Sequence, residues 1–190
     1  MTEAHDKRRS IAAAAANLFD AKGYHRVNMT DIAHAVGLQK PSLYHYFPSK
    51  SLILFAIHED FFNPALERAE AFALLPPRQA LRELMVDILR LMESHPGHLR
   101  VVFEHHRELE ADEQAIIRFK RDRYQEIVES VIRRGIAQGE FRDVDQRIST
   151  LAIFGMCNWA YQWYKPGLLT PEEIGTFMAD LILTGLHARS

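Results

Sequence analysis

The sequence predicts an all-α fold of nine helices, and three observations support this prediction. Apolar residues recur at helical spacing along the 190-residue chain, and no stretch of β-branched and aromatic residues alternates with polar residues as a strand would. Glycines and prolines stand between the helical stretches, where such residues end helices. The composition, with 47% hydrophobic and 25% charged residues, is typical of a globular protein and excludes disordered and collagen-like chains.

Start and stop signals divide the chain into nine helical segments. The expected helices cover residues 7–21, 30–36, 40–47, 49–73, 78–94, 97–109, 112–137, 145–164 and 171–188. In the first segment apolar side chains share one face, and Gly23 ends the helix. In the second, the Thr30 hydroxyl group can cap the first turn, and Gly37 ends the helix. In the third, Pro41 is tolerated because a first-turn N–H has no partner inside the helix.

The later segments have their own boundary signals. Ser49 can cap the fourth helix, within which Pro64 predicts a kink or a break. The pair Pro76-Pro77 separates the fourth helix from the fifth. Thr170 and Glu173 form a capping-box pattern, in which each side chain satisfies a backbone N–H at the start of the last helix.

The stretch from Thr30 to Phe47 has the pattern of a helix-turn-helix motif. Steeply crossing helices need a small side chain at their contact, which Ala33 supplies, and Gly37 supplies a turn conformation that other residues reach only with strain. The residues expected to close the small core are Ile32, Ala33, Val36, Leu38, Leu43 and Phe47. The residues left exposed on the second helix of the motif are Lys40, Ser42, Tyr44, His45 and Tyr46. This cation, these hydroxyl groups and these aromatic edges suit base recognition in the DNA major groove.

Charge and cysteine content restrict the class of protein further. The formal net charge is only −2, but residues 1–50 hold seven Lys or Arg against four Asp or Glu, or +3. The remaining residues hold 16 against 21, or −5, so the first quarter is the basic end of the chain. The one cysteine, Cys157, cannot form an internal disulfide, which favours a reducing, cytoplasmic location. We expect no signal peptide and no membrane partner, because no apolar stretch is long enough.

Short motifs near the amino terminus resemble a known family. The chain carries Gly23-Tyr24, Met29-Thr30-Asp31-Ile32-Ala33, Val36-Gly37-Leu38, Leu43-Tyr44-His45-Tyr46-Phe47 and Ser49-Lys50 in this order. In order and spacing they resemble the signature of the TetR/AcrR transcriptional regulators, over about the first 55 residues. The resemblance implies a homodimeric repressor that binds a double-stranded DNA operator and is released by a small molecule. It implies a DNA-binding domain at residues 1–47 and a helical ligand-binding and dimerisation domain at 48–190.

The same resemblance implies which residues contact DNA. The residues directed toward the major groove would be Lys40, Pro41, Ser42, Tyr44 and His45. Thr30, Tyr46 and Lys50 would hold phosphates, and Lys50 would do so at the amino end of the fourth helix. Gln39 departs from the family pattern, in which a small hydroxyl residue more often caps the recognition helix.

Large apolar side chains in the second half predict a ligand pocket, with core packing or a dimer interface as the alternatives. The aromatic residues concerned are Phe103, Trp159, Tyr161, Trp163 and Tyr164. The segments 103–107 and 158–167 resemble TetR-family members that respond to acyl-coenzyme A thioesters or related lipid catabolites. We therefore expect a small apolar or acyl-coenzyme A-type effector that contacts Phe103, Trp159 and Trp163. The last two helices are the expected dimer interface, with its apolar residues at Leu181, Ile182, Leu183 and Leu186.

Enzymatic and metal-dependent functions find little support in the sequence. The histidines His95, His98, His105 and His106 lack the spacing of a metal site, and we expect no metal, no cofactor and no catalytic residue. Cys157 lies in an apolar run, where a thiol is neutral and inert. Two alternatives remain: a constitutive DNA-binding protein without an inducer, and a helical enzyme that uses the histidines.

Overall fold

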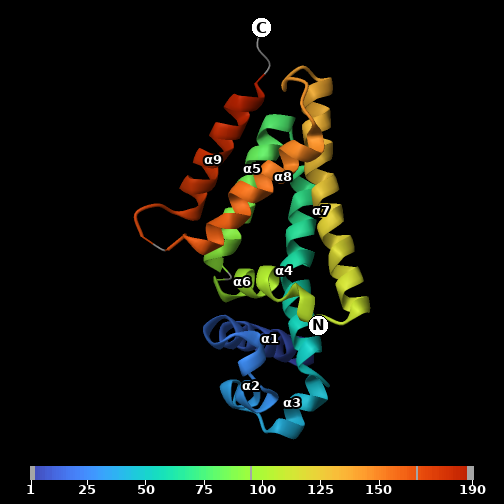
Figure 1. Cartoon of the computed structure of the whole chain (residues 1–190), viewed down its shortest axis with the longest axis vertical. Coiled ribbons are helices and arrows are strands. Elements are labelled where there is room, and N and C mark those ends of the chain that lie inside the picture. Colours follow the sequence, from blue (N-terminus) through green and yellow to red (C-terminus); the bar gives the residue numbers. More distant parts are fainter. Residues whose placement is uncertain (1–2, 95, 166, 188–190) are drawn as a thin grey trace. The chain divides into compact units, whose positions relative to one another are not determined.

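The computed structural model describes residues 3–94, 96–165 and 167–187, and their fold consists of nine α-helices (Figure 1). In these residues the chain forms no strand, and Phe141 and His187 make an isolated β-bridge. The all-α prediction is therefore confirmed. A search of the same residues finds no helix with the length and apolarity needed to span a membrane.

The helix boundaries fall close to the predicted ones at most positions. The α-helices are α1 (Glu3–Lys22), α2 (Met29–Ala35), α3 (Lys40–Tyr46), α4 (Lys50–Phe72), α5 (Pro77–Ser94), α6 (Pro96–Glu104), α7 (Ala111–Ala137), α8 (Gln146–Asn158) and α9 (Pro171–Leu186). Three short 3₁₀ helices join them: η1 (Tyr24–Arg26), η2 (His106–Glu108) and η3 (Trp159–Gln162).

Two of the predicted helices are shorter than expected, and a third lacks the break that a proline predicted. The sixth helix ends at Glu104. Beyond it, the His106 ring bonds to the Phe103 carbonyl, which in a continuing α-helix would accept from the backbone N–H of Arg107. The eighth tightens into η3 after Asn158, instead of continuing as an α-helix to Tyr164. In the fourth, α4 continues through Pro64 without a break.

The chain folds into two compact units. The first combines residues 1–64 with 96–119, and the second combines residues 65–95 with 120–190. Helices α4 and α7 each begin in the first unit and end in the second. The boundary predicted after Phe47 separates a DNA-binding domain from a ligand-binding domain. The division into compact units does not test this functional boundary, so it stays a prediction.

In the first unit, α1 packs against α2 and α6. Its buried face carries Ile11, Ala12, Ala15, Ala16 and Phe19. The small alanines of this face allow close helix approach, and Phe19 meets Tyr24 edge to face with ring centroids 5.0 Å apart. At the rim of the contact, Arg100 of α6 pairs with Asp20 of α1 at 3.4 Å.

The helix-turn-helix segment forms as predicted except at its first cap. The side chain of Asn28, not that of Thr30, caps α2 by accepting from the N–H groups of Thr30 and Asp31. The Asp31 carboxylate accepts in return from the Asn28 N–H at 2.9 Å, which completes a capping box. Gly37 has φ of +66°, the left-handed conformation that favours glycine between the two helices.

In the second unit, α9 packs against α5 so closely that Gly175 has no room for a side chain. A Cβ atom on Gly175 would lie 2.8 Å from the Cα of Val86. The predicted capping box at the start of α9 is present, since Thr170 accepts from Glu173 N–H and the Glu173 carboxylate accepts from Thr170 N–H. Hydrogen bonds from the backbone N–H and then the hydroxyl of Thr170 lower the pKa of the Glu173 carboxyl.

Candidate functional site

Helix α3 presents a polar face above two buried anchors. Leu43 and Phe47 have no solvent exposure, so they fix the rotation of the helix. The predicted base-reading residues on the opposite side are all exposed: Lys40, Pro41, Ser42, Tyr44 and His45. Tyr44 leaves 41% of its surface in solvent, which rules out core packing as its role in the described chain. The structure therefore leaves all five predicted base-reading residues exposed, around the part of α3 that Leu43 and Phe47 do not occupy.

Within this face the side chains lie close to one another. The Lys40 ammonium lies 5.9 Å from the centre of the Tyr44 ring, and the His45 and Tyr46 rings meet edge to face at 5.8 Å. Tyr46 is half-buried, so its ring packs on the protein while part of it remains accessible. The face combines a cation, an imidazole and two phenol groups on a helix narrow enough for a major groove.

The start of α3 lacks a side-chain cap. Gln39 is the N-cap residue, with extended backbone angles of φ −75° and ψ 147°, and its side chain makes no capping hydrogen bond. The departure from the family pattern seen in the sequence thus has a structural counterpart: the Gln39 side chain leaves the first-turn N–H groups of α3 uncapped.

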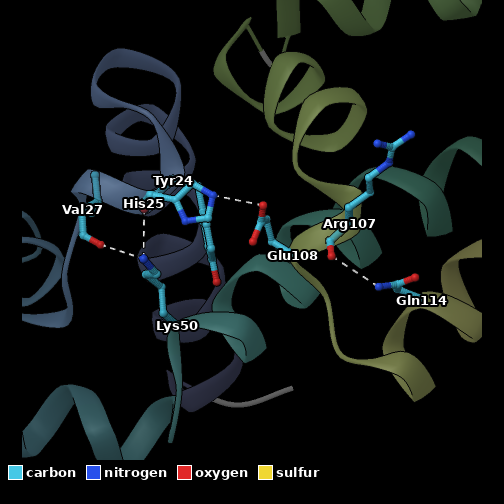
Figure 2. Close-up of polar contacts among 7 residues, drawn as sticks. All are labelled: Tyr24, His25, Val27, Lys50, Arg107, Glu108 and Gln114. Carbon is cyan, nitrogen blue, oxygen red and sulfur yellow. Dashed lines mark hydrogen bonds and ion pairs between the residues drawn. The ribbon is translucent and has the colours of Figure 1, made fainter.

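Lys50, a predicted phosphate contact, also has a structural role, which Figure 2 shows. Its ammonium donates to the carbonyl oxygens of Tyr24 and Val27, each at 3.0 Å, and lies 4.1 Å from the centre of the Tyr24 ring. Partial burial lowers the pKa of Lys50. Two of its three N–H donors thus hold the turn before α2, and one remains for another acceptor. Thr30, the other early phosphate candidate, is exposed in the first turn of α2.

Arg8 is a site residue that sequence reasoning missed. Its guanidinium donates to the carbonyl oxygen of Tyr46 and lies 4.1 Å from the centre of the Phe47 ring. It thereby satisfies a carbonyl group at the end of α3 and stacks on the anchor of that helix. The basic run Lys7-Arg8-Arg9 in the sequence was the signal that could have pointed to it.

The turn at Tyr24 contacts the segment that follows α6, all within the first unit. His25 Nε2 and Glu108 Oε1 are 3.0 Å apart (Figure 2), and Ser51 donates to Glu113 at 2.7 Å. Burial, and then the nearby carboxylates of which Glu108 contributes most, raises the pKa of Tyr24 to about 12. Residues beside the helix-turn-helix motif are therefore tied by polar contacts to the segment between α6 and α7 and to the first turn of α7.

The predicted effector residues lie in different units. Phe103 is half-buried on α6 in the first unit, whereas Trp159 and Trp163 belong to the second. Trp159 is 62% exposed and Trp163 is 47% exposed, so plain core packing does not describe them. The structure brings the two tryptophans together around η3, and it places Phe103 in a separate compact unit.

The exposed apolar surface of the second unit continues along α8 and α9. On α8 it includes Ile148, Ala152 and Gly155, followed by Trp159 at the start of η3, and on α9 it includes Phe177, Leu181 and Gly185. The spacing of these residues places each set on one face of its helix. A Cβ atom on either glycine would meet nothing within 4 Å, so both faces are open. Of the predicted interface residues, Leu183 and Leu186 instead pack inside the second unit, Ile182 is half-buried, and Leu181 is exposed.

Among the described residues, no group of three or more His, Cys, Asp and Glu side chains could hold a metal ion. His95 lies outside the described residues. Burial raises the pKa of the Cys157 thiol to about 12, which keeps it protonated.

Comparisons with known proteins agree with the geometry of both units. Residues 11–57 match the family model described as bacterial regulatory proteins of the tetR family. Residues 74–186, more than half of the chain, match the model described as the tetracyclin repressor-like C-terminal domain.

Individual relatives extend over nearly the whole chain. The TetR family transcriptional regulator PfmR from Thermus thermophilus is 33% identical, with a TM-score of 0.88 over 93% of this chain and 98% of that one. AibR, in complex with isovaleryl coenzyme A and operator DNA, is 28% identical, with a TM-score of 0.82 over 96% and 99%. The HTH-type transcriptional repressor KstR2 of Rhodococcus jostii (strain RHA1) is 24% identical over 95% of this chain and 91% of that protein.

Proposed function

The chain belongs to the TetR family of DNA-binding transcriptional regulators, and from this premise we propose that it is a ligand-responsive repressor. In this proposal a homodimer binds a palindromic operator in the cytoplasm and is released by a small hydrophobic or acyl-coenzyme A-type effector. The observation that carries the proposal is the exposed polar face of α3, held in place by the fully buried Leu43 and Phe47.

We assign base reading and phosphate binding to different residues of the DNA-binding segment. The base readers are Lys40, Pro41, Ser42, Tyr44 and His45, because all of them are exposed on α3. Thr30, Tyr46 and Lys50 hold phosphates and so set the position of the helix on the duplex. For Lys50, the N–H donor that the two backbone carbonyls do not use is the one assigned to a phosphate.

The open faces of α8 and α9 support the proposed homodimer. Phe177 is 65% exposed and Leu181 is 54% exposed, one helical turn apart on α9. Apolar side chains beside small residues suit a two-fold helix contact, in which each face meets its own copy. Such a dimer would present two recognition helices to half-sites roughly 34 to 36 Å apart.

The effector class is supported by one relative and by the aromatic residues of this chain. AibR has been crystallised with isovaleryl coenzyme A and operator DNA, and we assign an effector of related chemistry here, with Trp159 and Trp163 as its contacts in the second unit. The effector acts by binding one conformation of the dimer more tightly than the DNA-bound one, which shifts the population away from the operator.

Operator selection from random DNA, followed by binding of variants, tests the DNA-binding proposal. Lys40→Ala and His45→Ala should relax the preference at particular base pairs by about 1 to 3 kcal/mol. Tyr46→Phe and Lys50→Met should weaken binding to all sequences alike, and Lys50→Met should reduce the slope of log affinity against log salt by about 1.

Lys22→Met is the matched control for a lost charge, because Lys22 is exposed at the end of α1, outside the assigned set. It should retain the affinity and the salt slope of the unmodified protein. Wild-type affinity and base preference in all four α3 and α4 variants would show that α3 is not the recognition helix.

A further inference from the structure

An ion pair in the second unit leaves one oxygen atom unused. Arg68 of α4 donates through Nε to Oδ1 of Asp87 on α5 at 2.8 Å. The Asp87 side chain is only 7% exposed. Its second oxygen, Oδ2, is buried and has no hydrogen-bond partner among the described residues.

Two more buried oxygen atoms of the same unit share this condition. The Tyr124 hydroxyl on α7 and the Thr150 hydroxyl on α8 are buried, and the described chain offers neither a hydrogen-bond partner. The Tyr124 ring lies 5.8 Å from the ring of Phe154, which follows Thr150 by one turn of α8. The unused groups therefore come from α5, α7 and α8; the Asp87 carboxylate acts electrostatically on the Tyr124 hydroxyl, and α8 contacts Tyr124 through Phe154.

Unpaired buried oxygen atoms are rare in folded proteins, because each loses its hydrogen bonds to water without replacement. One such atom is often explained by strain or by an unseen water molecule, whereas three from three helices of one unit are groups that a bound ligand would satisfy. A carboxylate oxygen offers only an acceptor, whereas each hydroxyl group offers a donor and an acceptor. The complementary ligand group is one that donates one hydrogen bond and accepts another.

The charge around Tyr124 limits this group further. Burial raises the pKa of Tyr124 most, the Asp87 carboxylate and Cys157 raise it as well, and Arg68 lowers it by less. A negative charge at the Tyr124 hydroxyl is therefore disfavoured by its surroundings. The same surroundings disfavour a ligand carboxylate at this position and favour a neutral group.

We infer that the second unit binds the buried end of an effector through a neutral hydroxyl group, which donates to Asp87 Oδ2 and accepts from the Tyr124 hydroxyl. The Thr150 hydroxyl supplies a further hydrogen bond from α8. This inference rests on the proposed ligand-responsive function and narrows its effector class to hydroxylated apolar molecules, including hydroxyacyl thioesters. A free fatty acid that enters by its carboxylate is excluded.

Matched pairs of alcohols and acids test the ligand chemistry on the full-length protein without DNA. The probes are 1-octanol, 1-decanol and cyclohexylmethanol, each beside the carboxylic acid with the same carbon skeleton, and the readout is the melting temperature. At least one alcohol should raise the melting temperature, because a ligand that binds only the folded state stabilises it, and its paired acid should not. The inference is overturned if no alcohol raises it or if the acids raise it equally.

Two variants separate ligand binding from a structural role. Tyr124→Phe and Thr150→Val remove hydroxyl groups without partners, so they should not lower the melting temperature of the free protein but should abolish the alcohol-induced shift. Ser130→Ala is the control on α7, because its hydroxyl bonds to the Ile127 carbonyl in its own helix, and the shift should survive there.

A destabilised Tyr124→Phe protein, or one that keeps the full alcohol shift, would show that the hydroxyl serves an internal water molecule or the fold. The melting experiments need no DNA, and operator selection needs no ligand. Failure of this inference is thus distinguishable from failure of the proposed DNA-binding function.

Discussion

Arg8, Asn28 and Lys50 make their hydrogen bonds in the DNA-binding segment to backbone groups. Arg8 donates to the carbonyl of Tyr46, Lys50 donates to two carbonyls before α2, and the Asn28 side chain accepts from two N–H groups. Every residue carries such groups, so contacts of this kind leave no pattern of paired residue types in a sequence. This is why the sequence pointed to Thr30 as the cap and did not reveal the contacts of Arg8.

The uncapped start of α3 makes a prediction about Gln39. In Gln39→Ser the new hydroxyl should accept from the N–H of Ser42, since Pro41 has none to offer. The unfolding free energy of Gln39→Ser should be about 1 kcal/mol higher than that of Gln39→Ala, which is the usual difference between serine and alanine at an N-cap. Urea denaturation of the two variants measures this difference. Equal stabilities would mean that α3 does not begin at Lys40 in solution.

At the scale of elements, the sequence predicted best where a helix boundary depends on local residues. The start of α9 follows from Thr170 and Glu173, which bond to each other's backbone, and the prediction was confirmed. The end of α6 was predicted at Leu109 instead of Glu104, because no glycine or proline stands between these residues to mark the boundary. The unpaired oxygens of Asp87, Tyr124 and Thr150 come from three helices, so only the folded structure shows that they are buried without partners among the described residues.

The close contact between α5 and α9 predicts a penalty for a single methyl group. Gly175→Ala should lower the unfolding free energy by about 1 to 3 kcal/mol, because the added carbon meets backbone of Val86 that cannot rotate away. Thr176→Ala, the next residue on α9, adds no atom and should not show this loss. Urea denaturation of both variants measures the effect, and a fully stable Gly175→Ala protein would contradict the separation of α5 and α9 described here.

At the scale of the whole molecule, the sequence indicated which helices are apolar but not which of their residues face outward. The consecutive run from Leu181 to Leu183 occupies most of one turn, so it cannot lie on a single face. In the structure Leu183 is buried in the second unit, and Leu181 is exposed beside Phe177. Only the packing of α9 on α5 selects between these two residues.

The proposed homodimer should depend on Leu181 for assembly and on Leu183 for folding. Leu181→Asp places an unpaired charge at a two-fold contact, where it occurs twice, and should convert the dimer to monomers at low micromolar concentration. Leu183→Asp should instead destabilise the second unit. Sedimentation velocity measures the oligomeric state.

Leu74→Asp is the control for the same substitution, since Leu74 is exposed outside α8 and α9. This variant should stay dimeric. A dimeric Leu181→Asp protein would place the contact on another surface.

The division of the first unit into residues 1–64 and 96–119 has a consequence for synthesis on the ribosome. Helix α1 packs against α6 as well as α2, so part of its buried surface stays uncovered until residues well beyond the helix-turn-helix motif have been made. At ordinary translation rates, the 55 residues from 65 to 119 take roughly 3 to 11 s to synthesise. During that interval the nascent DNA-binding segment exposes an apolar surface, which makes it a natural client for a chaperone before it can meet an operator.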